Sequence, residues 1–183
     1  MKKTRILLGV TGGIAAYKSA DLCSKLLQAD CEVQVVMTPG ALNFVSALTF
    51  QTLSRRRVYT DMFSLLDDVR VEHIAIADWA ELAIVAPATA DFLAKYAHGL
   101  ADDALTTVLA AFSGTVLLAP AMNPKMWAHA ACQDNVATLR RRGVNFVGPN
   151  SGPVACGSVG VGRMAEVAEI IQAASQLAEA GGK

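Results

Sequence analysis

The segment Arg5-Ile-Leu-Leu-Gly-Val-Thr-Gly-Gly13 joins a short apolar run to a pair of glycines. An apolar run of this length, bounded by a turn, predicts a buried strand over Arg5–Val10. Helical spacing of apolar residues follows over residues 14–28. A strand, a tight turn and a helix in this order form the first unit of a parallel α/β sheet.

Apolar strands and helical segments keep alternating along the rest of the chain. Two stretches lack a regular pattern, the charged residues 54–71 and the glycine-rich residues 148–164. The alternation predicts an α/β fold in one domain over residues 1–183, with a parallel sheet and helices on both faces. The further strands are expected at 32–37, 82–86, 115–119 and 144–147, and the further helices over 41–53, 88–112, 121–142 and 165–180.

The composition argues against several classes of protein. The formal net charge is zero, so bulk charge favours neither a nucleic-acid partner nor a membrane surface. No apolar run approaches the ~18 residues of a membrane span, and no targeting segment is visible, which predicts a cytoplasmic protein. The cysteines have neither paired nor metal-ligand spacing, so we expect reduced thiols and no metal: Cys23, Cys31, Cys132 and Cys156.

The turn at Gly12 and Gly13 is a candidate phosphate site, because it leaves a strand and opens a helix. It lacks the three spaced glycines of a dinucleotide fingerprint, and Tyr17 stands where a P-loop requires glycine. The hydroxyl group of Thr38, at the end of the second strand, could donate to a phosphate. A plain tight turn remains the alternative.

Two Pro-Ala segments follow buried strands, at the edge of the sheet where ligands bind in such folds. The first, Pro87-Ala-Thr-Ala-Asp91, is equally well explained as the start of a helix capped by Thr89. The second, Pro120-Ala-Met-Asn-Pro-Lys-Met-Trp127, places Asn123 beside two thioethers and an indole. An amide in this position can donate to a carboxylate without adding charge.

At these residues the sequence resembles the homo-oligomeric flavin-containing cysteine decarboxylases. Four segments carry the resemblance, in the same order and spacing as in that family: GVTGGIAAYK, HIAIADWAELAIVAPATAD, PAMNPKMW and ACGSVGVGRM. The resemblance runs from about Arg5 to Met164. The match is best to the branch that acts on 4′-phosphopantothenoylcysteine in coenzyme A biosynthesis.

The resemblance implies a Rossmann-like, flavodoxin-type three-layer fold that binds FMN between the subunits of a homotrimer or homododecamer. It implies that His73, which alone would be interpreted as structural, and Cys156, on a substrate-covering flap, are catalytic. Substrate binding is implied for Asn123, Met122, Met126, Ala155 and Gly157. FMN contacts are implied for Gly12, Gly13, Ile14, Thr38, Phe44, Pro87, Ala88, Thr89 and Ala90.

The family reaction first oxidises the substrate to a thioaldehyde, then releases CO2, and finally reduces the resulting enethiol, so that the product is 4′-phosphopantetheine. Two departures stand out. Many relatives carry Asn in place of Asp91, and bacterial relatives usually carry a fused domain that ligates cysteine to phosphopantothenate. With the sequence ending at Lys183, we expect a stand-alone enzyme or an excised domain, with the ligase as a fused or separate partner.

Three other interpretations stay open. One is a peptidyl-cysteine decarboxylase, against which the flap residue Cys156 argues. Another is a flavin prenyltransferase, against which His73 and the PAMNPKMW segment argue. The third is a regulatory binding protein on the same scaffold, which need not keep His73, Asn123 and Cys156 together.

Overall fold

A five-stranded parallel sheet forms the centre of the computed structural model, which describes residues 4–63, 72–153, 155 and 157–181. The strand order is β2-β1-β3-β4-β5, which is the flavodoxin-type order expected above. The strands are β1 (Arg5–Val10), β2 (Glu32–Met37), β3 (Leu82–Ala88), β4 (Thr115–Pro120) and β5 (Asn145–Phe146).

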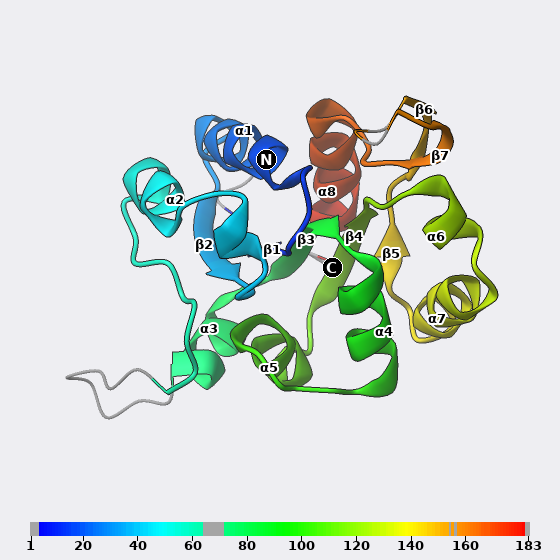
Figure 1. The fold of residues 1–183 in the computed structure, drawn as a ribbon. Coiled ribbons are helices and arrows are strands. Elements are labelled where there is room, and N and C mark those ends of the chain that lie inside the picture. The colour runs from blue at the N-terminus through cyan, green and yellow to red at the C-terminus, as the bar shows by residue number, and fades with distance from the viewer. Residues whose placement is uncertain (1–3, 64–71, 154, 156, 182–183) are drawn as a thin grey trace.

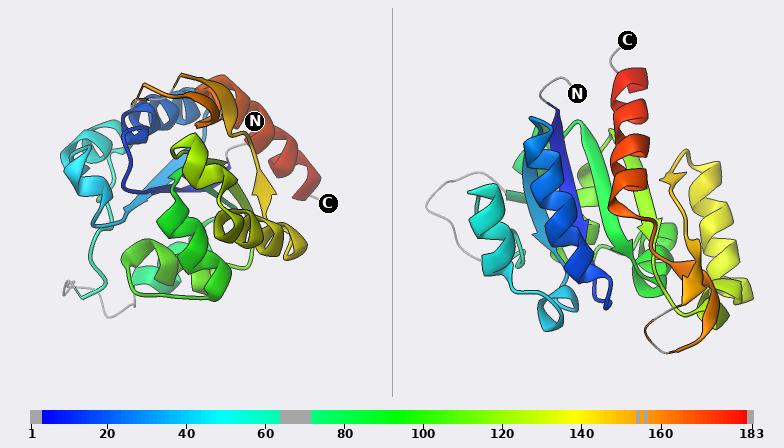
Figure 2. Two further views of the ribbon diagram at one scale, coloured as in Figure 1. Left: turned by 45° about the vertical axis from the view of Figure 1, so that its right-hand side comes forward. Right: turned by 90° about the horizontal axis from the view of Figure 1, so that it is seen from above.

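Helices cover both faces of this sheet (Figures 1 and 2). One face carries α1 (Ala16–Gln28), α2 (Ala47–Ser54) and α8 (Val167–Gly181). The other carries α3 (Glu72–Trp79), α4 (Ala90–His98), α5 (Ala104–Ala111) and α7 (Ala130–Arg141). The short helices η1 (Ala41–Asn43) and α6 (Pro124–Ala128) follow the carboxyl ends of β2 and β4.

The central strands are apolar throughout because both of their faces are buried. In β1, Ile6 and Leu8 point into the cluster beneath α1 and α8, whereas Leu7 points into the cluster beneath α4 and α5. All seven residues of β3 are buried in the same way. The side-chain period of two therefore divides one continuous apolar run between two cores.

Three predicted helices are interrupted. The segment 41–53 splits into η1 and α2, because Ser46 caps a new helix by accepting the backbone N–H of Leu48. The segment 88–112 splits where Gly99, at φ 71°, ends α4 and Asp103 caps α5. The segment 121–142 splits at His129 into α6 and α7.

Two further segments differ from the sequence prediction. Residues 148–164, expected as a loop, contain an antiparallel hairpin of β6 (Asn150–Pro153) and β7 (Val159–Arg163). Helix α3, over Glu72–Trp79, was not predicted, and it directly follows the stretch 54–71 that was predicted as irregular. Part of that stretch, residues 64–71, lies outside the described residues.

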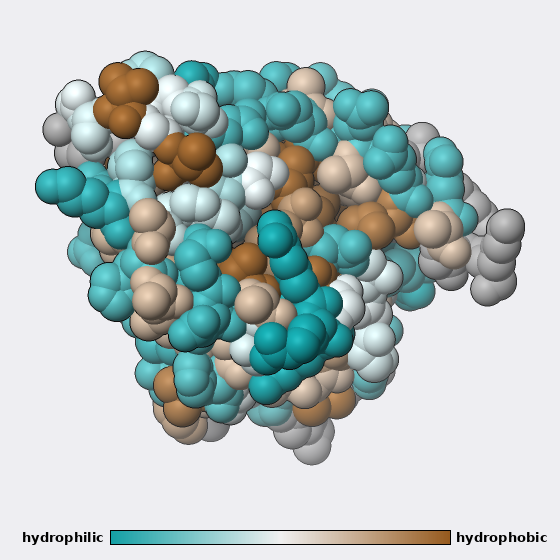
Figure 3. All heavy atoms as spheres, turned by 90° about the vertical axis from the view of Figure 1, so that its right-hand side faces the viewer, coloured by the Kyte–Doolittle hydropathy of each residue, from teal (hydrophilic) through white to brown (hydrophobic). Residues whose placement is uncertain are grey.

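The surface seen from the side of α6, α7 and the β6–β7 hairpin carries hydrophobic residues in separate groups among hydrophilic ones (Figure 3). Among the described helices, none combines the length and the apolarity that crossing a membrane would require. The same described residues contain no group of three or more His, Cys, Asp or Glu side chains arranged to hold a metal ion.

Candidate functional site

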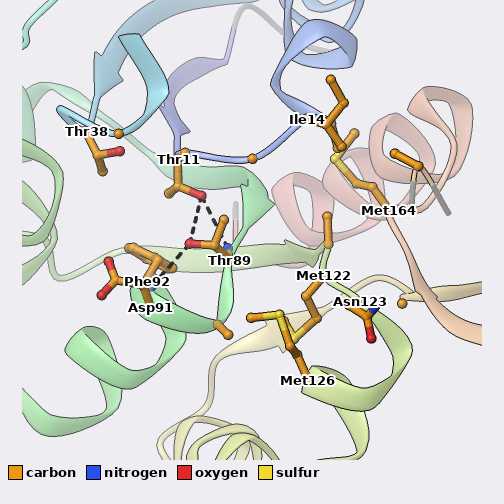
Figure 4. A pocket seen from close by; sticks show the side chains of 18 of the residues that line it. Thr11, Ile14, Thr38, Thr89, Asp91, Phe92, Met122, Asn123, Met126 and Met164 are labelled. Carbon is orange, nitrogen blue, oxygen red and sulfur yellow. Dashed lines mark hydrogen bonds between the residues drawn. The ribbon is translucent and has the colours of Figure 1, made fainter. Parts of the chain in front are cut away.

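A pocket of about 940 Å³ opens at the carboxyl ends of β1, β3 and β4. Figure 4 shows it between Thr38 on one side and Asn123 on the other. The turn before α1, the start of α4 and the β6–β7 hairpin complete its walls. Ten of the residues predicted from the sequence line this pocket: Gly12, Gly13, Ile14, Thr38, Thr89, Ala90, Met122, Asn123, Met126 and Ala155.

The hydroxyl group of Thr11 joins the ends of β1 and β3 beneath the pocket. It donates to the carbonyl oxygen of Pro87 at 2.7 Å and accepts from the backbone N–H of Thr89 at 3.2 Å. Thr89 in turn caps α4, since its hydroxyl oxygen accepts the backbone N–H of Phe92 at 3.3 Å (Figure 4). The loop after β3 is therefore held in place by a residue of β1's loop.

The loops after β1 and β2 touch through their backbones. A Cβ atom at Gly12 would lie 2.7 Å from the carbonyl carbon of Gly40, so only glycine permits this approach. A Cβ atom at Gly13 would meet the methyl group of Thr89 at 3.4 Å, an ordinary contact. Helix α1 starts beyond this turn without a side-chain cap, so the N-terminal amides of the helix favour an anion here.

Thr38 lies at the same end of the pocket as the glycine turn. Its hydroxyl oxygen accepts the backbone N–H of Ala41 at 3.3 Å, which leaves the hydroxyl proton to donate to a ligand. Thr38 is almost fully buried. The pairing of Thr38 with the Gly12–Gly13 turn that was expected from the sequence is therefore present.

Asn123 is oriented by the helix that it caps. Its Oδ1 atom accepts the backbone N–H of Lys125 at 2.8 Å, so the amide nitrogen Nδ2 is the end that can donate into the pocket. Nδ2 lies 3.5 Å from the hydroxyl oxygen of Ser158, at the long limit of a hydrogen bond. The cap thus fixes the amide with its donors toward a ligand.

The β6–β7 hairpin lies directly on the segment that carries Asn123. The backbone N–H of Met122 donates to the carbonyl oxygen of Gly162 at 2.9 Å. A Cβ atom at Gly162 would lie 2.3 Å from the carbonyl oxygen of Met122, and one at Gly160 would lie 2.9 Å from the side chain of Pro124. Glycine is needed at both positions for this close packing.

Charged residues line the pocket at two places. Lys95 faces three carboxylates, with Nζ 3.2 Å from Asp102, 3.5 Å from Asp91 and 3.8 Å from Asp103. Burial alone would lower the pKa of Lys95, but a hydrogen bond to Asp102 and the charges of all three carboxylates outweigh burial and raise that pKa. Asp91 therefore belongs to an ion-pair cluster.

The second charged group lies beside the hairpin. Lys18 of α1 places Nζ 3.2 Å from a carboxylate oxygen of Glu166, and the guanidinium group of Arg163 pairs with the same carboxylate. The pKa of Glu166 lies below its usual value, chiefly because Lys18 donates a hydrogen bond to it, with smaller contributions from the charges of Lys18 and Arg163.

Five of the residues predicted from the sequence do not line the pocket. Pro87 and Ala88 are buried in β3, where the carbonyl group of Pro87 accepts the bond from Thr11. Phe44 is half exposed beyond η1, and Gly157 is exposed at φ 82°. His73 lies on α3, which packs against α5. Cys156 lies outside the described residues.

The structure also brings in residues that the sequence prediction did not select. Thr11 could have been chosen from its place at a strand end, since its neighbours were. Lys18, Lys95 and Arg163 carry no such local signal. The partner of Lys18 is distant in sequence, and the pairs of Lys95 with Asp91 and of Arg163 with Glu166 are ordinary short-range ion pairs. The remaining cysteines are buried, and burial raises the pKa of Cys23 to about 11, which suits a packing role.

Comparison with known proteins identifies the family. Residues 1–179 match the model of the Flavoprotein family, and the chain belongs to that family, as the resemblance predicted. The coenzyme A biosynthesis bifunctional protein CoaBC of Bacillus subtilis is 48% identical over 176 residues, which are 96% of this chain and 43% of that protein. The chain thus spans less than half the length of this relative.

Two solved structures are similar over almost the whole chain. A PPC decarboxylase mutant complexed with pantothenoylaminoethenethiol is 31% identical, with a TM-score of 0.90 over 97% of this chain and 100% of that one. The FMN-binding protein AtHal3 is also 31% identical, with a TM-score of 0.86 over 98% of both chains. The predicted flavodoxin-type three-layer fold is confirmed.

Proposed function

We propose that this chain catalyses the FMN-dependent decarboxylation of 4′-phosphopantothenoylcysteine to 4′-phosphopantetheine in coenzyme A biosynthesis. One observation carries the proposal: a single pocket joins the turn at Gly12 and Gly13 to the amide of Asn123. The relatives support it, since one is named for coenzyme A biosynthesis and another is a PPC decarboxylase. The ligase activity of the bifunctional relatives would then reside outside this domain.

The residues at the glycine end of the pocket fit FMN. The approach of Gly12 to Gly40 leaves a backbone cradle at the start of α1, and Thr38 offers a hydroxyl donor beside it. This set suits one terminal phosphate group. The side chain of Ile14 and the small residues Thr89 and Ala90 would then border the flat ring system. Phe44, Pro87 and Ala88 do not line the pocket and would support the FMN site from behind its wall.

The residues at the other end fit a cysteine carboxylate. The Nδ2 atom of Asn123 would donate to it, because Oδ1 is engaged in capping α6. Met122 and Met126 provide apolar surface against which the substrate sulfur could pack. Ala155 and Gly157, next to the β6–β7 hairpin, would cover the substrate.

Bound FMN would supply two-electron oxidation and reduction at the carbon that bears the substrate sulfur. Asn123 would hold the carboxylate while its bond to the neighbouring carbon breaks. His73 would act as a base or charge partner toward the substrate thiol. Cys156 would return a proton to the product carbon, because an unperturbed thiol is mostly protonated at neutral pH.

In this proposal His73 acts from a second copy of the chain. It lies on α3, outside the residues that line the pocket of its own subunit. We therefore place the complete site between subunits, with His73 supplied by a neighbour in a homotrimer. Exposed apolar side chains support such a contact, two in the pocket wall and three on or beside η1 and α2: Ile14, Tyr17, Leu42, Phe44 and Leu48.

The test is to incubate the FMN-loaded protein with 4′-phosphopantothenoylcysteine and to analyse the products by mass spectrometry. We expect 4′-phosphopantetheine and one equivalent of CO2. Release of CO2 with accumulation of the enethiol would instead favour the peptidyl-cysteine type of decarboxylase. No turnover by a fully flavin-loaded oligomer would overturn the proposal and favour a regulatory binding protein.

A further inference from the structure

The charges along the pocket are distributed unevenly. At one place Lys95 is opposed by three carboxylates, those of Asp91, Asp102 and Asp103. At the other place two cations, Lys18 and Arg163, share the single carboxylate of Glu166. Among the pocket residues that the structure describes, cationic charge therefore exceeds anionic charge only beside the β6–β7 hairpin.

The side chains of the two cations differ in their exposure to solvent. The side chain of Lys18 is 16% exposed, so its ammonium group stays within the pocket wall. Arg163 is 41% exposed and extends over Gly152, where a Cβ atom would lie 3.5 Å from its Nη1 atom. Both can therefore reach a ligand at the rim while Glu166 keeps them together.

A second carboxylate near this group, that of Glu169, accepts hydrogen bonds from other donors. One of its oxygens accepts the backbone N–H of Glu166 and the side-chain amide of Asn150, each at 2.7 Å. Within the part of the chain that the structure describes, Glu166 is the one carboxylate that forms ion pairs with Lys18 and Arg163. The group thus carries one net positive charge and can accept a dianion.

The position of this group matches the substrate end of the pocket. Arg163 directly follows Gly162, whose backbone packs on Met122 and Asn123. Thr38, which suits the flavin phosphate, lies on the opposite side of the pocket from Asn123 (Figure 4). If Asn123 holds the carboxylate of the substrate, the rest of the substrate chain would run along β7 toward Lys18.

We propose that Lys18 and Arg163, positioned by Glu166, form a subsite for the terminal phosphate monoester of the substrate and select phosphorylated over unphosphorylated substrates. A phosphate monoester offers three acceptor oxygens, which suits an ammonium and a guanidinium group together. This inference rests on the proposed decarboxylase function, and it assigns the specificity of the same site.

The experiment compares kcat/KM for 4′-phosphopantothenoylcysteine with kcat/KM for pantothenoylcysteine. In Lys18→Met and Arg163→Met, the preference for the phosphorylated substrate should fall by about tenfold or more, as expected for the loss of a charge-assisted hydrogen bond. Arg163→Lys should lie between Arg163→Met and the parent. Lys25→Met is the matched control, because Lys25 lies on the same helix but pairs with Asp21 outside the pocket.

Flavin content, measured in parallel, distinguishes binding of the substrate phosphate from binding of the FMN phosphate. A subsite for the substrate predicts unchanged FMN occupancy in both variants. Loss of FMN would assign Lys18 and Arg163 to the cofactor phosphate and overturn the inference. An equal loss of kcat/KM on both substrates, or no change in the preference, would overturn it as well. If the parent converts neither substrate, the proposed function itself fails.

Discussion

The hydroxyl group of Thr11 donates a hydrogen bond to the carbonyl oxygen of Pro87 at 2.7 Å. The two residues are 76 positions apart in the chain but lie at the ends of the neighbouring strands β1 and β3. Thr11 is only 1% exposed, so water does not compete for the bond. The floor of the pocket is thus joined across two strands before any ligand binds.

We expect Thr11→Val to destabilise the cofactor-free protein by about 1–3 kcal/mol, because it leaves a buried carbonyl group and the N–H of Thr89 without their partner. Thr11→Ser keeps the hydroxyl group and should lose much less. Urea unfolding of both variants measures the difference. Equal stability of the Val and Ser variants would contradict the assigned role of this bond.

The neighbouring glycines should respond differently to the same change. Gly12→Ala forces a Cβ atom against the backbone of Gly40 and should cost about 1–3 kcal/mol in the cofactor-free protein. Gly13→Ala meets only the methyl group of Thr89 at ordinary contact distance and should be nearly neutral. Calorimetry of the two variants tests this ordering, and a stable Gly12→Ala protein would show that the two loops can separate.

Asn123→Asp should retain the helix cap, since Asp caps as well as Asn, and should therefore keep normal thermal stability. The added negative charge would oppose the substrate carboxylate. We expect KM to rise by about tenfold or more, together with slower turnover. Steady-state kinetics at constant flavin content provides the measurement. An unchanged KM would remove Asn123 from carboxylate binding.

Mixing subunits tests the origin of His73. His73→Asn should be inactive alone, and Asn123→Asp should show little activity at substrate concentrations far below its raised KM. If each site takes His73 from one subunit and Asn123 from another, an equal mixture of the two, unfolded and refolded together, should regain about a quarter of the parent activity. A site built within one subunit would regain none, because every subunit in the mixture carries one substitution.

The ion pairs of Lys95 should contribute about 1 kcal/mol near neutral pH, since the side chain is only 24% exposed and faces three carboxylates. The pKa of Lys95 is raised in the folded state. Its contribution is therefore complete below the unfolded pKa near ~10.4 and is lost as the pH rises through the higher folded value. The stability difference between the parent and Lys95→Met should shrink in that alkaline range. Lys25→Met, whose single pair is exposed, should show a smaller difference near neutral pH.

The sheet and its order follow from short-range signals in the sequence. Apolar runs identify β1, β3 and β4, because a strand buried on both faces has no polar alternation. In the edge strand β2, polar residues alternate with buried apolar ones over its first half. The breaks within helices were missed because they depend on single capping residues, such as Ser46 and Asp103, inside otherwise helical patterns. The β6–β7 hairpin was missed because its strands are rich in glycine and pack on α6.

The candidate site was predictable where its residues lie in short segments that follow the strands. Gly12, Thr38, Thr89 and Asn123 each follow the end of a strand within three residues, and parallel strands bring their carboxyl ends to one edge. The association of Lys18 with Glu166 was not predictable, because the two residues are 148 positions apart and only the packing of α1 beside α8 brings them together. In the proposed function His73 acts from a neighbouring subunit, and no pattern within one chain describes such a contact.

The backbone contact between Gly12 and Gly40 also limits how this pocket can evolve. No side chain separates the two loops at this contact. Every substitution of Gly12 adds at least one carbon atom, and even that atom collides with the backbone of Gly40. Variation that alters substrate range must therefore arise at side chains on the other wall, such as Met126 and Arg163. A selection for new substrates should place its codon diversity there and leave the glycine turn as it is.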